Sequence, residues 1–225
     1  MHKIEIPEEI RQACIRRRGK VHVFDSLVPE RTALVVIDMQ NSWLEPGAAL
    51  EIPNARSIVD NINAIASALR RSGGHVAWTQ STFEPGWTRS FYEGFCSPAW
   101  IERSIVETAP GHRGFDIHAR MAVAPEDIIS MKNRPSAFVQ GSSDLDQRLR
   151  AQGVDTIIIT GTLTNACCES SARDAAALGY RVLFASDGTA TRSDLEHNAA
   201  LINLMQLVAD VRTTRELVEL VSADG

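Results

Sequence analysis

The chain has 225 residues, of which 44% are hydrophobic and 23% charged, and its formal net charge is −5 at pH 7. A chain of this kind can bury a core without disulfides or metals, and its charge gives no reason to expect a nucleic acid or an anionic membrane as a partner. Its four cysteines, Cys14, Cys96, Cys167 and Cys168, lack the spacing of a disulfide framework and indicate a reducing compartment. We therefore expect a cytoplasmic protein with a single domain that spans residues 1–225.

Residues 1–30 predict a helix and a linker that precede the rest of the domain. We expect the helix between Pro7 and Gly19, because acids occupy its first turn, arginines occupy its last turn and a glycine follows. The first twenty residues lack the apolar core of a secretory signal, and no segment approaches the length that spans a bilayer.

Residues 32–80 predict a βαβ unit. Residues 32–37 form a continuous apolar run, typical of a strand buried on both faces, and Asp38 follows directly. Apolar residues recur at helical spacing over residues 54–71, and residues 75–80 predict a second strand.

Residues 81–124 are rich in proline and glycine, so we expect an irregular segment that serves as a lid or a pocket wall. Residues 127–132 predict a strand that ends at Lys132, and residues 143–152 predict a helix.

Residues 155–179 predict a strand, a turn at Gly161 and a helix that begins near two adjacent cysteines. Cys168 shares a helical face with Ala172 and is expected to pack on the sheet, whereas Cys167 is rotated off that face. Because the N-terminal end of a helix favours negative charge, we expect Cys167 to be held as a reactive thiolate.

A strand over residues 181–187, a helix over 193–208, a short strand over 210–213 and a last helix from Thr214 complete the pattern. Strands and helices thus alternate along the chain. This alternation predicts an α/β fold, a three-layer αβα sandwich with an open, mostly parallel, Rossmann-like sheet.

Such a sheet places Asp38, Lys132 and Cys167 at its carboxyl edge, where loops bind ligands. A cysteine nucleophile needs a base and a nearby positive charge, and Asp38 and Lys132 suit these two roles. We expect Cys167 to attack a carbonyl carbon. The backbone N–H groups of Leu163 and Cys167 are expected to form the oxyanion hole.

Three motifs resemble the isochorismatase-like cysteine hydrolase superfamily: VIDMQN at residues 36–41, KNRPSAF at 132–138 and TGTLTNACCESSARDA at 160–175. The likeness covers roughly residues 32–220. It implies an Asp–Lys–Cys triad at Asp38, Lys132 and Cys167, and a cis peptide bond between Thr162 and Leu163.

Two departures narrow what the resemblance implies. Nicotinamidases of the family carry an aspartate and two histidines as metal ligands after the second strand, but residues 79–84 contain no histidine, so we expect no metal and no cofactor. Isochorismatases of the family generally lack the nucleophilic cysteine that this chain has at position 167. The resemblance therefore favours the metal-free C–N hydrolases, which include carbamoylsarcosine amidases and ureidoacrylate amidohydrolases.

The expected function is cleavage of the C–N bond of a small amide or ureide through a thioester on Cys167. Two alternatives remain open: an isochorismatase-type vinyl-ether hydrolase, and a non-catalytic binding or scaffold member of the superfamily. The expected partners are the small-molecule substrate and further copies of the chain, in a dimer or tetramer.

Four residues are candidates for substrate binding. Trp43 and Phe138 follow strands that carry the triad, and Gln40 lies in the first motif. Arg89 lies on the segment that could close over the pocket, where it is either a partner for a substrate carboxylate or a solvated surface residue.

Overall fold

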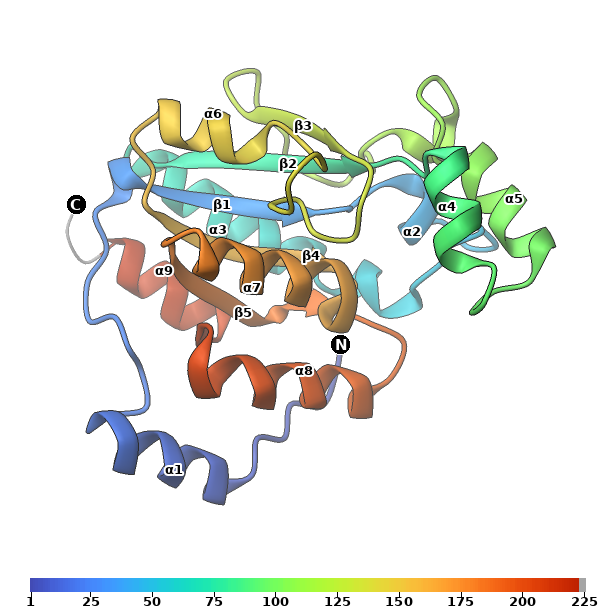
Figure 1. Cartoon of the computed structure of the whole chain (residues 1–225). Helices are drawn as coiled ribbons and strands as arrows, with labels where there is room; N and C mark the ends of the chain where they lie inside the picture. The colour runs from blue at the N-terminus through green and yellow to red at the C-terminus, as the bar shows by residue number, and fades with distance from the viewer. Residues whose placement is uncertain (223–225) are drawn as a thin grey trace.

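The structure, a computed structural model, describes residues 1–222 and confirms the α/β fold (Figure 1). Six parallel strands form one open sheet in the order β3-β2-β1-β4-β5-β6. The strands are β1 (Thr32–Ile37), β2 (His75–Ser81), β3 (Ile128–Lys132), β4 (Thr156–Thr162), β5 (Arg181–Ala190) and β6 (Asp210–Arg212). Every residue of β1 is buried, as its apolar run predicts for a central strand.

Helices cover both faces of the sheet and complete the predicted three layers (Figure 1). One face packs against α3 (Val59–Arg71) and α9 (Thr214–Ser222). The other packs against α6 (Leu145–Ala151), α7 (Glu169–Ala177) and α8 (Asp194–Leu207). Helix α8 begins as predicted, because the Ser193 hydroxyl caps it by accepting the N–H of Glu196.

The predicted N-terminal helix is α1 (Glu8–Arg18), and it packs on the outer side of α8 (Figure 1). Cys14 of α1 is buried in this contact, and Arg17 and Arg18 donate hydrogen bonds to carbonyl groups at the end of α8. Within residues 1–222, no helix has both the length and the apolar character needed to cross a membrane.

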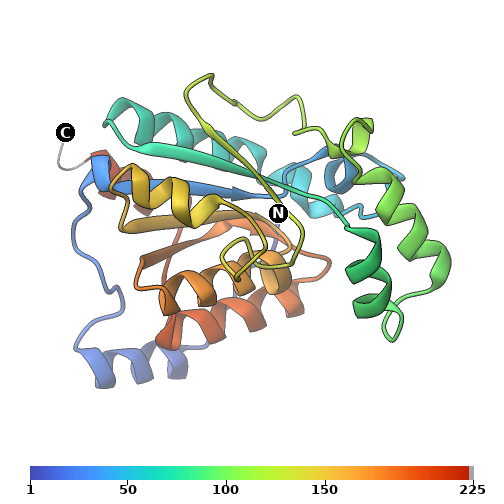
Figure 2. The ribbon, with the colours of Figure 1, turned by 45° about the horizontal axis from the view of Figure 1, so that its top comes forward.

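The segment between β2 and β3 is more regular than predicted. It contains α4 (Pro85–Tyr92) and α5 (Pro98–Glu107), which extend past the carboxyl ends of the strands (Figure 2). Pro85 and Pro98 stand at the first positions of these helices, where a missing N–H costs nothing. The prediction of an irregular segment was wrong because it treated these prolines as helix breakers.

Gly161 allows β4 to lie close to the end of β1. Its φ is +106°, and a Cβ atom at this position would lie 2.0 Å from the carbonyl oxygen of Ile37. No other residue type fits there without moving a strand. Gly161 thus helps to set the position of Ile37 and of Asp38, which follows it.

Candidate active site

Three buried or partly buried polar side chains meet at the carboxyl edge of the sheet. Asp38 follows β1, Lys132 ends β3, and Cys167 lies in a π-helical turn (Thr164–Cys168) between β4 and α7. The Nζ atom of Lys132 lies 2.8 Å from Asp38 Oδ2 and 3.5 Å from Cys167 Sγ. The structure therefore brings together the three residues that the sequence pattern placed at this edge.

Asp38 is fully buried and has a left-handed backbone conformation, with φ of +53°. The hydroxyl of Thr79 on β2 donates a hydrogen bond of 2.8 Å to Asp38 Oδ1. Burial raises the pKa of Asp38 above its ordinary value, more than the Lys132 charge and the hydrogen bonds from Thr79 and Cys167 lower it. A carboxylate with a raised pKa is a better proton acceptor than an ordinary aspartate.

Lys132 is also fully buried, and its ammonium group is surrounded by acceptors. Besides Asp38 and Cys167, it contacts the Arg134 carbonyl oxygen at 3.1 Å and the Ser81 hydroxyl at 3.4 Å. Burial by itself lowers the pKa of Lys132, but the interactions of its ammonium group with Asp38 and Cys167 outweigh burial and raise this pKa above its ordinary value. Lys132 thus remains a fixed positive charge.

Burial dominates the electrostatic surroundings of the Cys167 sulfur. The protein packed around its sulfur raises the pKa of Cys167 to about 12, although the Lys132 charge acts in the opposite direction. The direction of this shift favours the thiol over the expected thiolate, because burial outweighs the lysine. Cys168, by contrast, is buried against the sheet as predicted.

The turn that carries Cys167 is held by contacts from both sides. The carbonyl of Leu163 accepts the N–H groups of Ala166 and Cys168, each at 3.1 Å, and the predicted cis peptide bond between Thr162 and Leu163 is present. His197 of α8 is fully buried, and its Nδ1 accepts the hydroxyl of Thr164 at 2.9 Å. Among the described residues, the Leu163 N–H donates to no backbone carbonyl, so it is open to a ligand.

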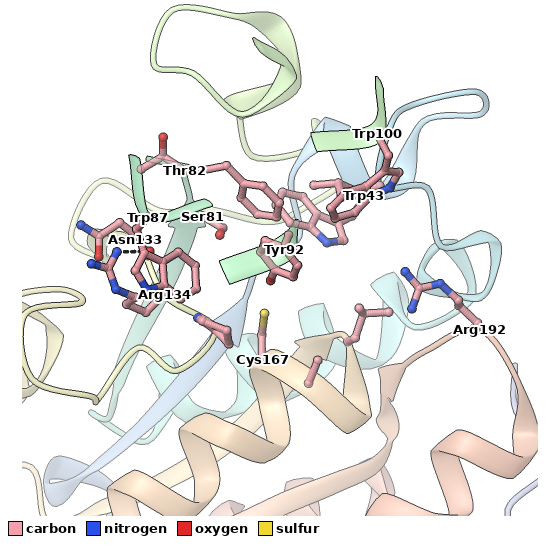
Figure 3. A pocket seen from close by; sticks show the side chains of 15 residues that line it. Trp43, Ser81, Thr82, Trp87, Tyr92, Trp100, Asn133, Arg134, Cys167 and Arg192 are labelled. Atoms are coloured by element: carbon pink, nitrogen blue, oxygen red, sulfur yellow. Dashed lines mark hydrogen bonds between the residues drawn. The ribbon is translucent and has the colours of Figure 1, made fainter. Parts of the chain in front are cut away.

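A pocket opens above Cys167, as Figure 3 shows. Its volume is about 120 Å³, so it suits a small ligand. One side is an aromatic wall formed by Trp43, Phe83, Trp87, Tyr92 and Trp100. The wall comes mainly from the segment that the sequence predicted to be a lid or pocket wall.

Two arginines line the pocket, and neither was predicted. Figure 3 shows Arg134 and Arg192 on opposite sides of Cys167. The Arg134 guanidinium stacks on the Trp87 ring at 4.3 Å. Arg192 follows β5, and no hydrogen bond joins it to another of the side chains drawn.

Arg89 does not belong to this pocket. Its exposed guanidinium forms a bidentate ion pair with Glu102 of α5, with distances of 2.6 and 2.7 Å. A carboxylate of the protein thus occupies the position that the sequence hypothesis reserved for a substrate carboxylate. Arg89 is therefore a solvated surface residue, the second of the two alternatives that the sequence left open.

Of the other three predicted substrate-binding residues, only Trp43 lines the pocket. Gln40 is fully buried and joins two backbone segments: its Oε1 accepts the Ser81 N–H at 2.7 Å, and its Nε2 donates to the Phe115 carbonyl at 2.7 Å. Phe138 is buried beside the ring of Tyr180, at 5.6 Å between centroids. Gln40 and Phe138 are therefore buried structural residues beside the site, and neither lines the pocket.

Tyr92 is the pocket residue that the sequence reasoning missed most clearly. Its position at the end of α4 was hidden because the segment was expected to be irregular. The helical spacing of Thr88 and Tyr92, four residues apart and both turned inward, is the signal that would have found it.

The residues after β2 offer no metal ligands of the nicotinamidase kind, since residues 79–84 contain no histidine. Within residues 1–222, no three side chains among His, Cys, Asp and Glu are grouped as a metal ion requires.

A pocket at the carboxyl edge of a parallel sheet is the usual ligand site of an open α/β fold. The chain belongs to the isochorismatase domain family, which it matches over residues 32–216. The resemblance found in the sequence is therefore confirmed.

Three similar proteins each cover most of the chain. It is 30% identical over 206 residues to ureidoacrylate amidohydrolase RutB of Caulobacter vibrioides, which covers 84% of this chain and 90% of that protein. A cysteine hydrolase from Pseudomonas syringae pv. phaseolicola has 28% identity and a TM-score of 0.81, and covers 91% of this chain and 98% of that one. N-carbamoylsarcosine amidase from Thermoplasma acidophilum shares the fold at 24% identity, with a TM-score of 0.67 over 82% of this chain and 96% of that one.

Proposed function

We propose that this protein is a cysteine hydrolase that cleaves the C–N bond of a small ureide or amide through a thioester on Cys167. The observation that carries the proposal is the contact of Lys132 Nζ with both Asp38 and Cys167, 2.8 and 3.5 Å away, at the floor of a pocket. These three groups supply a nucleophile, a base and a fixed positive charge. The relatives named as amidohydrolases and amidases support the same class of reaction.

The first step is attack by sulfur on the substrate carbonyl carbon. The Cys167 proton passes to the Asp38 carboxylate, which Lys132 joins to the sulfur, while the new C–S bond forms and the carbonyl electrons move to oxygen. The raised pKa of Asp38 favours this transfer, and Lys132 stabilises the negative charge that remains on the pair.

The oxyanion formed in this step needs hydrogen-bond donors. The open N–H of Leu163 and the N–H of Cys167, both on the turn that holds the nucleophile, are proposed to supply them. The Thr164–His197 hydrogen bond holds the turn from below, so the donors are in position before substrate arrives.

The second half of the reaction releases both products. The tetrahedral intermediate collapses, the C–N bond breaks and the nitrogen leaves with the proton that Asp38 held. Water then attacks the thioester carbon, gives its proton to Asp38 and displaces the sulfur, which recovers its proton. A ureide would yield a carbamate, which decomposes to carbon dioxide and ammonia.

We propose further that the substrate carries a carboxylate. Arg192 presents a guanidinium to the pocket, and a bidentate Arg–carboxylate contact gives both affinity and orientation. Both names among the relatives, ureidoacrylate and N-carbamoylsarcosine, denote ureido acids. A ureido acid would place its carboxylate at Arg192 and its ureido carbonyl over Cys167.

The proposal is tested by ammonia release from ureidoacrylate, N-carbamoylsarcosine, N-carbamoylglycine and nicotinamide, with isochorismate assayed in parallel. We expect turnover of at least one ureido acid, its loss in Cys167→Ala, and an acyl group on the Cys167 peptide after acid quenching. Failure to hydrolyse any ureido acid would contradict the substrate class. Hydrolysis of isochorismate that survives Cys167→Ala would show that the vinyl-ether alternative is correct.

The carboxylate contact has its own test with a matched control. Arg192→Gln should raise KM for the ureido acid by about tenfold or more, because a charged hydrogen bond is lost, and should leave an uncharged analogue such as methylurea unaffected. Arg89→Gln removes another exposed guanidinium, one that lies outside the pocket, and should change neither. Equal effects of the two substitutions would contradict the role of Arg192.

A further inference from the structure

The ring of Tyr92 is held rigidly within the aromatic wall. It lies parallel to Phe83, with 5.7 Å between centroids and an interplanar angle of 7°. It meets Trp100 edge-on at 5.6 Å and 66°, and Trp87 at 6.0 Å and 84°. Such stacked and edge-to-face contacts fix the plane of the ring, so its hydroxyl has a defined direction.

That direction is toward the nucleophile. Figure 3 shows the Tyr92 hydroxyl pointing at the sulfur of Cys167, and no dashed line joins it to another of the side chains drawn. Tyr92 and Cys167 line the same pocket, and the electrostatic surroundings of the phenol include Cys167, Lys132 and Asp38. A group bound over the sulfur would therefore lie between Cys167 and an available hydroxyl donor.

The hydroxyl keeps its proton under ordinary conditions. Burial is the largest cause that raises the pKa of Tyr92 to about 12, and the interaction with Cys167 is the second. The phenol is thus a neutral donor beside a sulfur that becomes negative during the reaction, and it does not compete with Asp38 for the thiol proton.

We infer that Tyr92 is a catalytic residue, whose hydroxyl donates a hydrogen bond to the substrate carbonyl oxygen as Cys167 attacks. The inference rests on the proposed hydrolase reaction and adds a side-chain donor from the lid helix α4 to the backbone donors of the turn. The phenol transfers no proton: it stabilises the charge that builds on oxygen and releases it when the carbonyl reforms. The carboxylate of the substrate already has its partner in Arg192, so the hydroxyl is free for the reacting group.

The helix that carries this donor is held in place. Glu84 caps α4 by accepting the N–H groups of Gly86 and Trp87, at 3.0 and 2.8 Å, and α5 packs beside it. The position of the Tyr92 hydroxyl therefore depends on the packing of α4.

The test is Tyr92→Phe, which removes one oxygen and keeps the stacked ring. We expect kcat for the ureido acid found above to fall by about 10²-fold, as for the loss of one oxyanion donor, with KM nearly unchanged. Acetylation of Cys167 by p-nitrophenyl acetate, followed by nitrophenolate release in a single turnover, should slow by a similar factor. Nitrophenolate leaves the ester without being protonated. A slower reaction with the ester therefore reports the hydrogen bond to the carbonyl oxygen and not a proton transfer to the leaving group.

Tyr180→Phe is the matched control, because the chain contains two tyrosines and the Tyr180 hydroxyl donates to Asp146 at 2.8 Å, outside the pocket. It should leave kcat and ester acetylation unchanged. A Tyr92→Phe enzyme with full kcat, or one that is slow with the amide but not with the ester, would overturn the inference. Cys167→Ala is measured beside it: activity that survives this change refutes the proposed function itself, so the two failures are distinguishable.

Discussion

Replacing Lys132 by methionine should leave a buried negative charge without its partner. Asp38 and Lys132 have no solvent exposure, and their charged atoms lie 2.8 Å apart. Breaking a buried ion pair by removing one partner costs roughly 3 to 5 kcal/mol, a large part of the roughly 5 to 15 kcal/mol that stabilises an ordinary domain. Lys132→Met should therefore lower the free energy of unfolding by about that amount at pH 7.

The cost should depend on pH in a defined direction. Burial already raises the pKa of Asp38 in the native protein, and loss of the Lys132 charge raises it further. A group whose pKa is raised by folding contributes stability below its unfolded pKa, and that stability is lost as the pH rises through the folded value. The deficit of Lys132→Met relative to the native protein should thus be small in acid and grow as the pH increases.

Urea unfolding of the native protein, Lys132→Met and Asp38→Asn/Lys132→Met, followed from pH 4 to pH 8, measures this effect. The double variant removes both charges and should recover much of the lost stability at neutral pH. It should also show little of the pH dependence. A Lys132→Met protein as stable as the native one at every pH would refute the reasoning, because Asp38 could not then be buried beside the ammonium group.

Three further predictions concern Gly161 of β4, the buried His197 and the absence of a metal requirement. Gly161→Ala should lower the free energy of unfolding by about 1 to 3 kcal/mol and reduce activity sharply, because its Cβ would lie 2.0 Å from the Ile37 carbonyl oxygen. Gly94→Ala is the control, because a Cβ atom there would meet nothing within 4 Å. Equal stabilities of the two variants in urea would contradict the prediction. Burial, and then the nearby His2, lower the pKa of His197 from 6.5 to about 4, so the stability it contributes is complete above pH 6.5 and falls by about 3 kcal/mol as the pH drops toward 4. His197→Asn should flatten that part of the stability curve, and an unchanged curve would show that another group is responsible. Exhaustive chelation should leave ammonia release unchanged, whereas a loss restored by zinc or manganese would show that residues 79–84 were misinterpreted.

Local patterns were enough to predict the sheet and its main elements. The apolar run before Asp38 predicts a central strand because only a strand covered on both faces has no need for polar side chains. The stripe through Cys168 and Ala172 predicts which face of α7 packs on the sheet, since helical periodicity is a property of the sequence itself. The meeting of Asp38, Lys132 and Cys167 follows, because parallel strands end at one edge.

The pocket depended on contacts between residues far apart in the chain, and local patterns do not contain these. Arg89 is neutralised by Glu102 of the neighbouring helix, whereas Arg192, from the other half of the chain, reaches the pocket. Tyr92 faces Cys167 only because Pro85 starts a helix that turns it inward. The protonation of Cys167 likewise depends on how much protein surrounds its sulfur, which is a property of packing. The sequence by itself therefore determined the fold and the edge where Asp38, Lys132 and Cys167 gather, and the tertiary structure alone decided which side chains line the pocket and in which direction the pKa of the thiol is shifted.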